Sequence, residues 1–191
     1  MSRLSLGARD ALSEGAGLAQ HIPGFVARPA QQRLAMAVAD TFEQRGVLLA
    51  EAGTGTGKTF AYLVPALLSG MKTIVSTGTR ALQDQLYFRD LPRVRDALGT
   101  GLKTALLKGR ANYLCRYRME QAKGDALPAK GMFSSRELVA QFQRVVAWSG
   151  RTQFGEMSEL ASLPEDSPLL PQVTSTADNC LGTDCPFWGD C

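Results

Sequence analysis

Residues 47–59 read VLLAEAGTGTGKT, and this stretch decides the fold. Its first four residues form a short apolar run of the kind found in buried parallel strands. Glycines and threonines then alternate up to Lys58 and Thr59, and the apolar residues 60–68 read as a helix. A strand, a glycine-rich loop and a helix in this order predict an α/β fold with a parallel sheet and a phosphate-binding loop, or P-loop.

The composition of the loop matches that chemistry. Glycines let backbone N–H groups wrap closely around phosphate oxygens, a lysine reaches the β- and γ-phosphates, and a Ser or Thr hydroxyl binds Mg²⁺. We therefore predict Lys58 and Thr59 as catalytic residues. The predicted nucleotide-binding residues of the loop are Ala52, Gly53, Thr54, Gly55, Thr56, Gly57, Lys58 and Thr59. Ala52 replaces the first glycine of the strict pattern G-x-x-x-x-G-K-[ST], and a small residue there can still make the turn.

The flanking segments extend the pattern. Leu34, Val38 and Phe42 recur at a spacing of four within residues 28–45, which predicts an amphipathic helix that stops at Gly46. After the P-loop helix, which Pro65 is expected to kink or shorten, we expect a strand, a helix broken at Pro92 and another strand, at residues 72–77, 79–98 and 103–108. This alternation predicts a parallel sheet covered by helices. Strand signals end near Gly109, and helical patches follow at 113–123 and 134–149.

Three segments around the P-loop resemble a known motor family. Residues 52–59 are similar to motif I of superfamily 2 helicases, and residues 28–31, RPAQ, are similar to the adenine-reading element before it. This resemblance implies that Gln31 binds the nucleotide; without it, Gln31 reads equally well as a solvent-facing helix residue. Residues 76–86, STGTRALQDQL, resemble motif Ia, which implies DNA-backbone contacts by Thr77 and Thr79. A helix N-cap at Thr79 is compatible with that role.

Four cysteines, Cys115, Cys180, Cys185 and Cys191, have the spacing C-x64-C-x4-C-x5-C. Four thiolates can bind either an iron–sulfur cluster or a structural zinc ion, and a cytosolic context disfavours disulfides. Zinc sites favour short C-x2-4-C pairs, and no C-x2-C pair occurs here. The spacing alone leaves cluster and zinc about equally supported.

The segments around these cysteines resemble the XPD/DinG class of iron–sulfur helicases, and within it the bacterial DinG/YoaA branch. They are residues 107–115, LKGRANYLC, and 178–191, DNCLGTDCPFWGDC. The resemblance implies a RecA-like motor domain with a mainly helical insertion that binds a [4Fe–4S] cluster. It implies a 5′→3′ DNA helicase that uses ATP and Mg²⁺ on single-stranded or forked DNA, with replication or repair proteins as possible partners. Lys108 and Arg110, near Tyr113 and Tyr117, suit a single strand or, equally, a solvated helix face.

The resulting domain prediction has three parts: residues 1–21 as a flexible lead-in, 22–109 as the first part of the motor domain, and 110–191 as the cluster domain. No Asp-Glu-x-His box occurs in the sequence. Since hydrolysis needs such an acidic pair, we expect an N-terminal fragment that by itself neither hydrolyses ATP usefully nor unwinds DNA.

Bulk properties add little. A net charge of +3 is weak evidence for a nucleic-acid partner, and no apolar run is long enough to cross a membrane, so we expect a cytoplasmic protein. Two other functions stay open. One is a nucleotide-binding domain with a four-cysteine zinc module that regulates or mediates interactions. The other is a non-helicase P-loop enzyme such as a small-molecule kinase.

Overall fold

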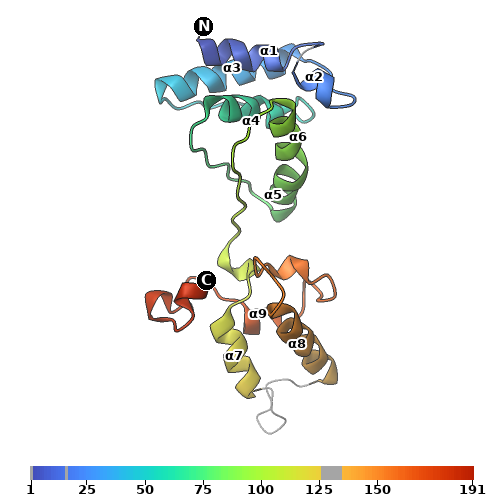
Figure 1. Ribbon diagram of the computed structural model, residues 1–191, viewed down its shortest axis with the longest axis vertical. Coiled ribbons are helices and arrows are strands. Elements are labelled where there is room, and N and C mark those ends of the chain that lie inside the picture. Colours follow the sequence, from blue (N-terminus) through green and yellow to red (C-terminus); the bar gives the residue numbers. More distant parts are fainter. Residues whose placement is uncertain (1, 16, 126–134) are drawn as a thin grey trace. The chain divides into compact units, whose positions relative to one another are not determined.

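The computed structural model describes residues 2–15, 17–125 and 135–191. The chain divides into two compact units, Met1–Leu106 (unit 1) and Leu107–Cys191 (unit 2), shown in Figure 1. The division falls after Leu106, close to the boundary that the sequence predicts near Gly109. The assignment of these parts to a motor domain and a cluster domain stays a prediction.

Unit 1 is a packed group of helices. They are α1 (Arg3–Ala11), α2 (Leu18–His21), α3 (Pro29–Gln44), α4 (Lys58–Ser69), α5 (Arg80–Gln85), the π-helical turn η1 (Leu86–Asp90) and α6 (Leu91–Ala97). Helix α3 packs against α1 and α4. It buries Ala35 and Ala39 completely, whereas the predicted face of Leu34 and Val38 is only half-buried. Small side chains on the buried stripe let the neighbouring helices approach closely, which spacing alone did not indicate.

The N-terminal segment differs from the expected flexible lead-in. Residues 3–11 form α1, whose first turn is capped by the Ser2 hydroxyl accepting from the Ser5 N–H at 2.9 Å. Ala8, Leu12 and Leu18 are fully buried in the core of unit 1. Burial of these apolar side chains against α3 and α4 stabilises the segment. Met1 and Ala16 lie outside the described residues.

The predicted sheet is not formed within the described residues. The segments expected as strands, 47–50, 72–77 and 103–108, form no β-ladder, and the part of the chain that the structure describes has two isolated bridges, both in unit 2. The apolar side chains of Val47, Leu49 and Ile74 are 93%, 94% and 89% exposed. Parallel strands need neighbours and covering helices to pair and bury them, and these segments have neither here.

Two prolines lie within helical segments of unit 1. Pro65 lies buried inside α4 without ending it, so the expected shortening does not occur. The expected break at Pro92 does not occur: the residues are helical from Arg80 to Ala97, and α6 begins at Leu91 directly after the widened turn η1. A proline lacks the N–H that a continuous helix would use, and a π turn accommodates that loss.

Unit 2 has its own core. Its elements are η2 (Arg110–Asn112), α7 (Arg116–Asp125), α8 (Arg136–Ser149), η3 (Met157–Glu159), α9 (Leu170–Val173), η4 (Gly182–Asp184) and η5 (Trp188–Asp190). Helix α8 begins after the N-cap Ser135, and residue 134 of the predicted helix lies outside the described residues. Phe142 and Trp148 are buried in this core with Met119 and Val145.

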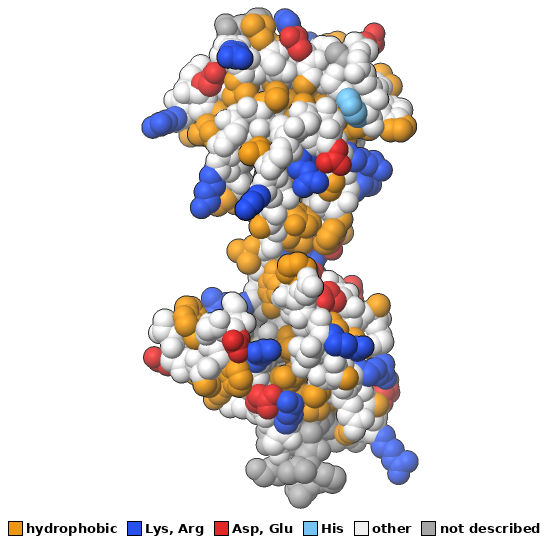
Figure 2. All heavy atoms as spheres, in the orientation of Figure 1, with side chains coloured by type: hydrophobic (Ala, Val, Ile, Leu, Met, Phe, Trp, Pro, Cys, Tyr) orange, Lys and Arg blue, Asp and Glu red, His pale blue; other side chains and the backbone are white. Residues whose placement is uncertain are grey.

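The described surface carries both signs of charge. Figure 2 shows Lys and Arg side chains scattered over the visible face rather than gathered in one basic patch. No helix among residues 2–15, 17–125 and 135–191 is long and apolar enough to span a bilayer.

Candidate nucleotide and metal sites

The P-loop has the backbone that its glycines predict. Gly55 and Gly57 have φ angles of 75° and 81°, in the left-handed region that favours glycine. Gly57 is the N-cap of α4, so the loop leads directly into the N-terminus of a 12-residue helix. Backbone N–H groups at such a terminus, together with the helix dipole, favour an anion.

Lys58 is held over this loop by backbone carbonyls. Its Nζ donates to the carbonyl oxygens of Ala52 and Gly53 at 2.6 Å and 2.8 Å. The Thr56 hydroxyl donates to the same Gly53 oxygen at 2.9 Å, which closes the turn. The ammonium group therefore lies at the loop that would receive phosphates, and Thr59 follows it in the first turn of α4.

Gln31 links helix α3 to the P-loop. It is buried, 4% exposed, and its Nε2 donates to the carbonyl oxygen of Gly57 at 2.9 Å. Among the described residues its Oε1 has no hydrogen-bond partner. A Cβ added at Gly57 would stand 2.1 Å from Gln31 Nε2, so this contact requires glycine. A solvent-facing position for Gln31 is thus wrong, whereas adenine recognition stays a prediction.

The two predicted DNA-contacting threonines lie at the start of α5. The Thr79 hydroxyl accepts from the Leu82 N–H at 3.2 Å and caps the helix, which confirms the N-cap reading. The Thr77 hydroxyl donates to the Thr79 carbonyl at 3.3 Å. Thr79 is exposed and could still reach a DNA backbone. The DNA contact of the two threonines stays a prediction.

Lys108 was predicted to contact DNA, which requires an exposed side chain, but its side chain is buried. It is 8% exposed, and its ammonium forms an ion pair with the Glu156 carboxylate. Its backbone N–H donates to the Tyr113 hydroxyl at 2.9 Å. Desolvation of a lysine needs such a partner, so this basic residue serves the core of unit 2 rather than its surface. Arg110, in contrast, is exposed.

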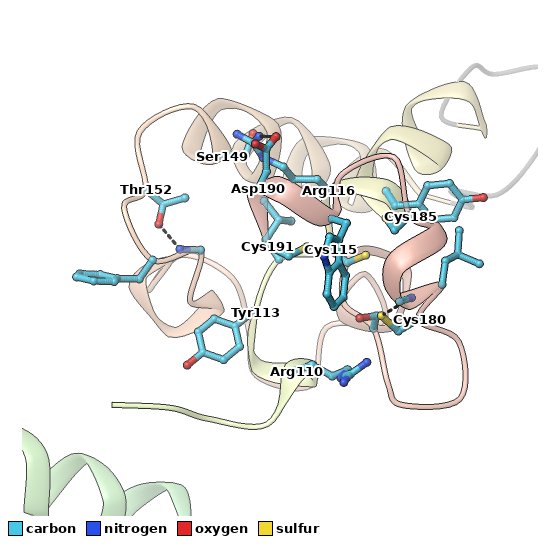
Figure 3. A pocket seen from close by; sticks show the side chains of 18 of the residues that line it. Arg110, Tyr113, Cys115, Arg116, Ser149, Thr152, Cys180, Cys185, Asp190 and Cys191 are labelled. Carbon is cyan, nitrogen blue, oxygen red and sulfur yellow. Dashed lines mark hydrogen bonds and ion pairs between the residues drawn. The ribbon is translucent and has the colours of Figure 1, made fainter. Parts of the chain in front are cut away.

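All four cysteines line one open pocket in unit 2 (Figure 3). They come from segments far apart in the sequence: Cys115 precedes α7, and the other three lie on the turns around η4 and η5. All four are free thiols. The same pocket is lined by Arg110, Tyr113, Arg116 and Asp190.

The first cysteine is fixed by short backbone pairings. The Cys115 N–H donates to the Val173 carbonyl at 2.7 Å, and the Leu114 N–H donates to the Gly155 carbonyl at 2.8 Å. Isolated antiparallel bridges pair Tyr113 with Glu156 and Leu114 with Thr174. These contacts bring the segment before α7 against the residues that lead into the three-cysteine loop.

The surroundings of Cys191 disfavour its thiolate. Burial raises the pKa of Cys191, and the nearby Cys115, Cys185 and Cys180 raise it further. A metal ligand must be a thiolate, so Cys191 would release its proton on binding a metal. Within the described ranges no three Cys, His, Asp or Glu side chains are yet placed to coordinate an ion.

Two long-range ion pairs of these sites were not predicted from the sequence. Glu156 pairs with Lys108 from 48 positions away. Arg116 Nη1 lies 2.6 Å from Asp190 Oδ2 across 74 positions. Arg116 directly follows Cys115, and Asp190 directly precedes Cys191. Their opposite charges beside the first and last cysteines could have indicated this second ion pair.

The comparisons with known proteins agree with the P-loop geometry. Residues 28–123 match the DEAD/DEAH box helicase family. The ATP-dependent DNA helicases YoaA of Haemophilus influenzae and Escherichia coli are 49% and 50% identical, each over 91% of this chain. The ATP-dependent helicase DinG of Mycobacterium tuberculosis is 40% identical over 88%. The chain covers 26%, 27% and 28% of these proteins, about a quarter of their length. It therefore belongs to the DEAD/DEAH box helicase family, with similarity to its YoaA and DinG members over about nine tenths of the chain.

Proposed function

We propose that the intact protein is an ATP-dependent DNA helicase of 5′→3′ polarity and that this chain provides its phosphate-binding loop. One observation carries the proposal: Lys58 Nζ is held by the carbonyls of Ala52 and Gly53 over a glycine turn that opens α4. The similarity to proteins named ATP-dependent DNA helicases over 91% of the chain supports the same function.

In this proposal each residue of the loop has a defined task. The N–H groups from Gly53 to Lys58 bind the phosphate oxygens, and the Lys58 ammonium balances the charge of the β- and γ-phosphates. The Thr59 hydroxyl binds Mg²⁺. Gln31, whose Nε2 donates to the Gly57 carbonyl, accepts from the adenine amine through Oε1, which has no hydrogen-bond partner among the described residues.

The proposed fold of the intact protein includes a RecA-like parallel sheet. The segments 47–50, 72–77 and 103–108 would pair as parallel strands in the intact protein. Their apolar side chains support this, since Val47, Leu49 and Ile74 are almost fully exposed in unit 1 and match the apolar composition of buried parallel strands. Residues 22–109 would then be the first part of the motor domain.

DNA contacts would involve Thr77 and Thr79, at the start of α5, and Arg110 in unit 2. Hydroxyl and guanidinium groups bind phosphate oxygens without reading sequence, as a motor that moves along any strand requires. Lys108 is not included, because it is buried and paired with Glu156. Repair or replication is the expected setting, with single-stranded or forked DNA as substrate.

The test uses the intact protein. We expect ATP hydrolysis that single-stranded DNA stimulates, and unwinding of forked duplexes with a 5′ tail. Both activities are lost in Lys58→Ala, because transition-state charge on the phosphates is no longer balanced. DNA-stimulated hydrolysis by intact Lys58→Ala would contradict the proposed role of the loop. Robust hydrolysis by residues 1–191 alone would contradict the expectation that this fragment is inactive without an acidic box.

A [4Fe–4S] cluster is the second part of the proposal. Four free thiols on one pocket match the Cys₄ donor set of such clusters. When bound, the cluster would cross-link Cys115 to the loop that carries Cys180, Cys185 and Cys191. These cysteines lie next to α7, η4 and η5. The bound cluster would therefore connect these elements and stabilise residues 110–191, the proposed cluster domain.

A zinc module at the same thiols is the alternative, because zinc also accepts four cysteines. Protein purified without air would separate the two. A brown protein with visible charge-transfer absorbance supports the cluster. A colourless protein with one zinc ion per chain supports a regulatory or interaction module instead.

A further inference from the structure

The three-cysteine loop is built mainly from local turns. Its backbone hydrogen bonds include Cys185 N–H to Gly182, Trp188 N–H to Cys185 and Asp190 N–H to Phe187, at 3.0–3.1 Å. Such turns set the spacing of the cysteines within the loop. They do not fix where the loop lies against the rest of unit 2.

One ion pair links the far end of this loop to the first-cysteine helix. Arg116 Nη1 lies 2.6 Å from Asp190 Oδ2, and both side chains line the cysteine pocket (Figure 3). Arg116 is the first residue of α7 and directly follows Cys115, while Asp190 directly precedes Cys191. The pair therefore joins the neighbours of the first and last cysteines of the set.

We propose that the Arg116–Asp190 ion pair positions the Cys191 end of the loop against Cys115, so that the four thiols bind their metal cluster and release it slowly. This inference rests on the proposed cluster at the four cysteines. Arg116 and Asp190 are positioning residues: they act through their neighbouring ligands.

Exposure decides how large the effect is. The two side chains are 47% and 57% exposed, so water and salt screen the pair. Loss of a single exposed ion pair is therefore expected to change the rate of cluster release by roughly two- to fivefold. Charge reversal adds repulsion and gives the larger end of that range.

Charge gives the pair a second consequence. Four thiolates concentrate negative charge, and the Arg116 guanidinium at the pocket offsets part of it. Replacing Arg116 by Gln is expected to shift the midpoint potential of a bound cluster to more negative values. Asp190→Asn is expected to shift it in the opposite direction, which a purely structural role of the two residues would not produce.

The experiment measures iron release to a chelator from the anaerobically purified chain. Arg116→Glu should release iron roughly two- to fivefold faster than wild type. The double variant Arg116→Asp with Asp190→Arg should restore the slow rate, since it rebuilds the pair with reversed charge. The matched control is Lys123→Glu, which makes the same charge change on α7 at another exposed pair, Lys123–Glu120, and should leave the rate unchanged.

The outcomes separate the two proposals. Wild-type chain without iron and sulfide would overturn the cluster itself and this inference with it. Wild-type chain that holds the cluster, with Arg116→Glu releasing iron at the wild-type rate, would overturn only the positioning role. If Arg116→Glu fails to fold, rescue of slow release by the charge-swapped double variant supports the inference, and faster release from that variant overturns it.

Discussion

The P-loop and the cysteine pocket are formed in different ways. The P-loop occupies eight consecutive residues, 52–59, and its shape comes from glycine φ angles and from carbonyls that hold Lys58 within the loop itself. The cysteine pocket combines Cys115 with a loop 65 to 76 positions later, through pairings to Gly155 and Val173. A local site depends on backbone conformation, whereas a long-range site depends on the packing that brings its segments together.

This difference predicts how each site responds to substitution. Damage to the P-loop should leave the rest of unit 1 folded. Damage to the supports of the cysteine pocket should reduce the stability of unit 2.

The largest expected effect is loss of the cluster in Cys115→Ser. Cys115 is the only cysteine outside the loop, so its removal leaves three ligands without a connection to α7. Iron and sulfide content should fall to background. Ser175→Ala, a change at a buried residue that lines the same pocket, is the control and should retain the cluster. Full iron content in Cys115→Ser would show that Cys115 is not a ligand.

A large effect on stability is expected from Lys108→Met. It leaves the Glu156 carboxylate, 13% exposed, with the Ser158 hydroxyl but without its cationic partner, and breaking a buried ion pair costs about 3–5 kcal/mol. Denaturant unfolding followed by tryptophan fluorescence measures this directly, because both tryptophans, Trp148 and Trp188, lie in unit 2.

The control for that change is Lys123→Met, which removes an exposed pair and should cost about 0–1 kcal/mol. Equal destabilisation by both variants would contradict a structural role for Lys108. Weaker single-strand binding by Lys108→Met with unchanged stability would restore its predicted DNA contact.

A smaller effect is expected from Lys58→Ala on nucleotide binding. Loss of a charged hydrogen-bond donor to phosphate costs about 1.5–3 kcal/mol, or roughly a tenfold to hundredfold weaker affinity. Titration with a fluorescent ATP analogue and Mg²⁺ would measure it. Lys72→Ala, at an exposed lysine outside the loop, should bind as wild type does. Equal affinities for the two variants would remove Lys58 from the phosphate site.

The smallest effect is expected from Gly57→Ala. Its φ of 81° disfavours any side chain by about 1–2 kcal/mol, and the added Cβ would displace Gln31. Adding Gln31→Ala removes the clash but not the backbone strain, so the double variant should recover part of the stability of unit 1. Gly78→Ala, where a Cβ meets nothing within 4 Å, is the control. No recovery in the double variant would mean that backbone strain alone decides this position.

The sequence predicted the local features of these sites and missed most long-range ones. The positions of Lys58, Gly57 and the Thr79 cap follow from patterns within a few residues, where spacing determines geometry. Burial of Lys108 could not be predicted, because its partner Glu156 lies on a distant loop with no periodic relation to it. The helical N-terminus was missed for a similar reason, since Ala8 and Leu12 are stabilised by α3 and α4 rather than by their own sequence.

Metal analysis of the wild-type chain tests most directly whether the distant cysteines form one site. Purified without air, the protein is expected to contain about four iron atoms and four acid-labile sulfides per chain, since a [4Fe–4S] cluster takes four cysteine ligands. One zinc ion per chain with no sulfide, or no metal at all, would contradict the proposed cluster.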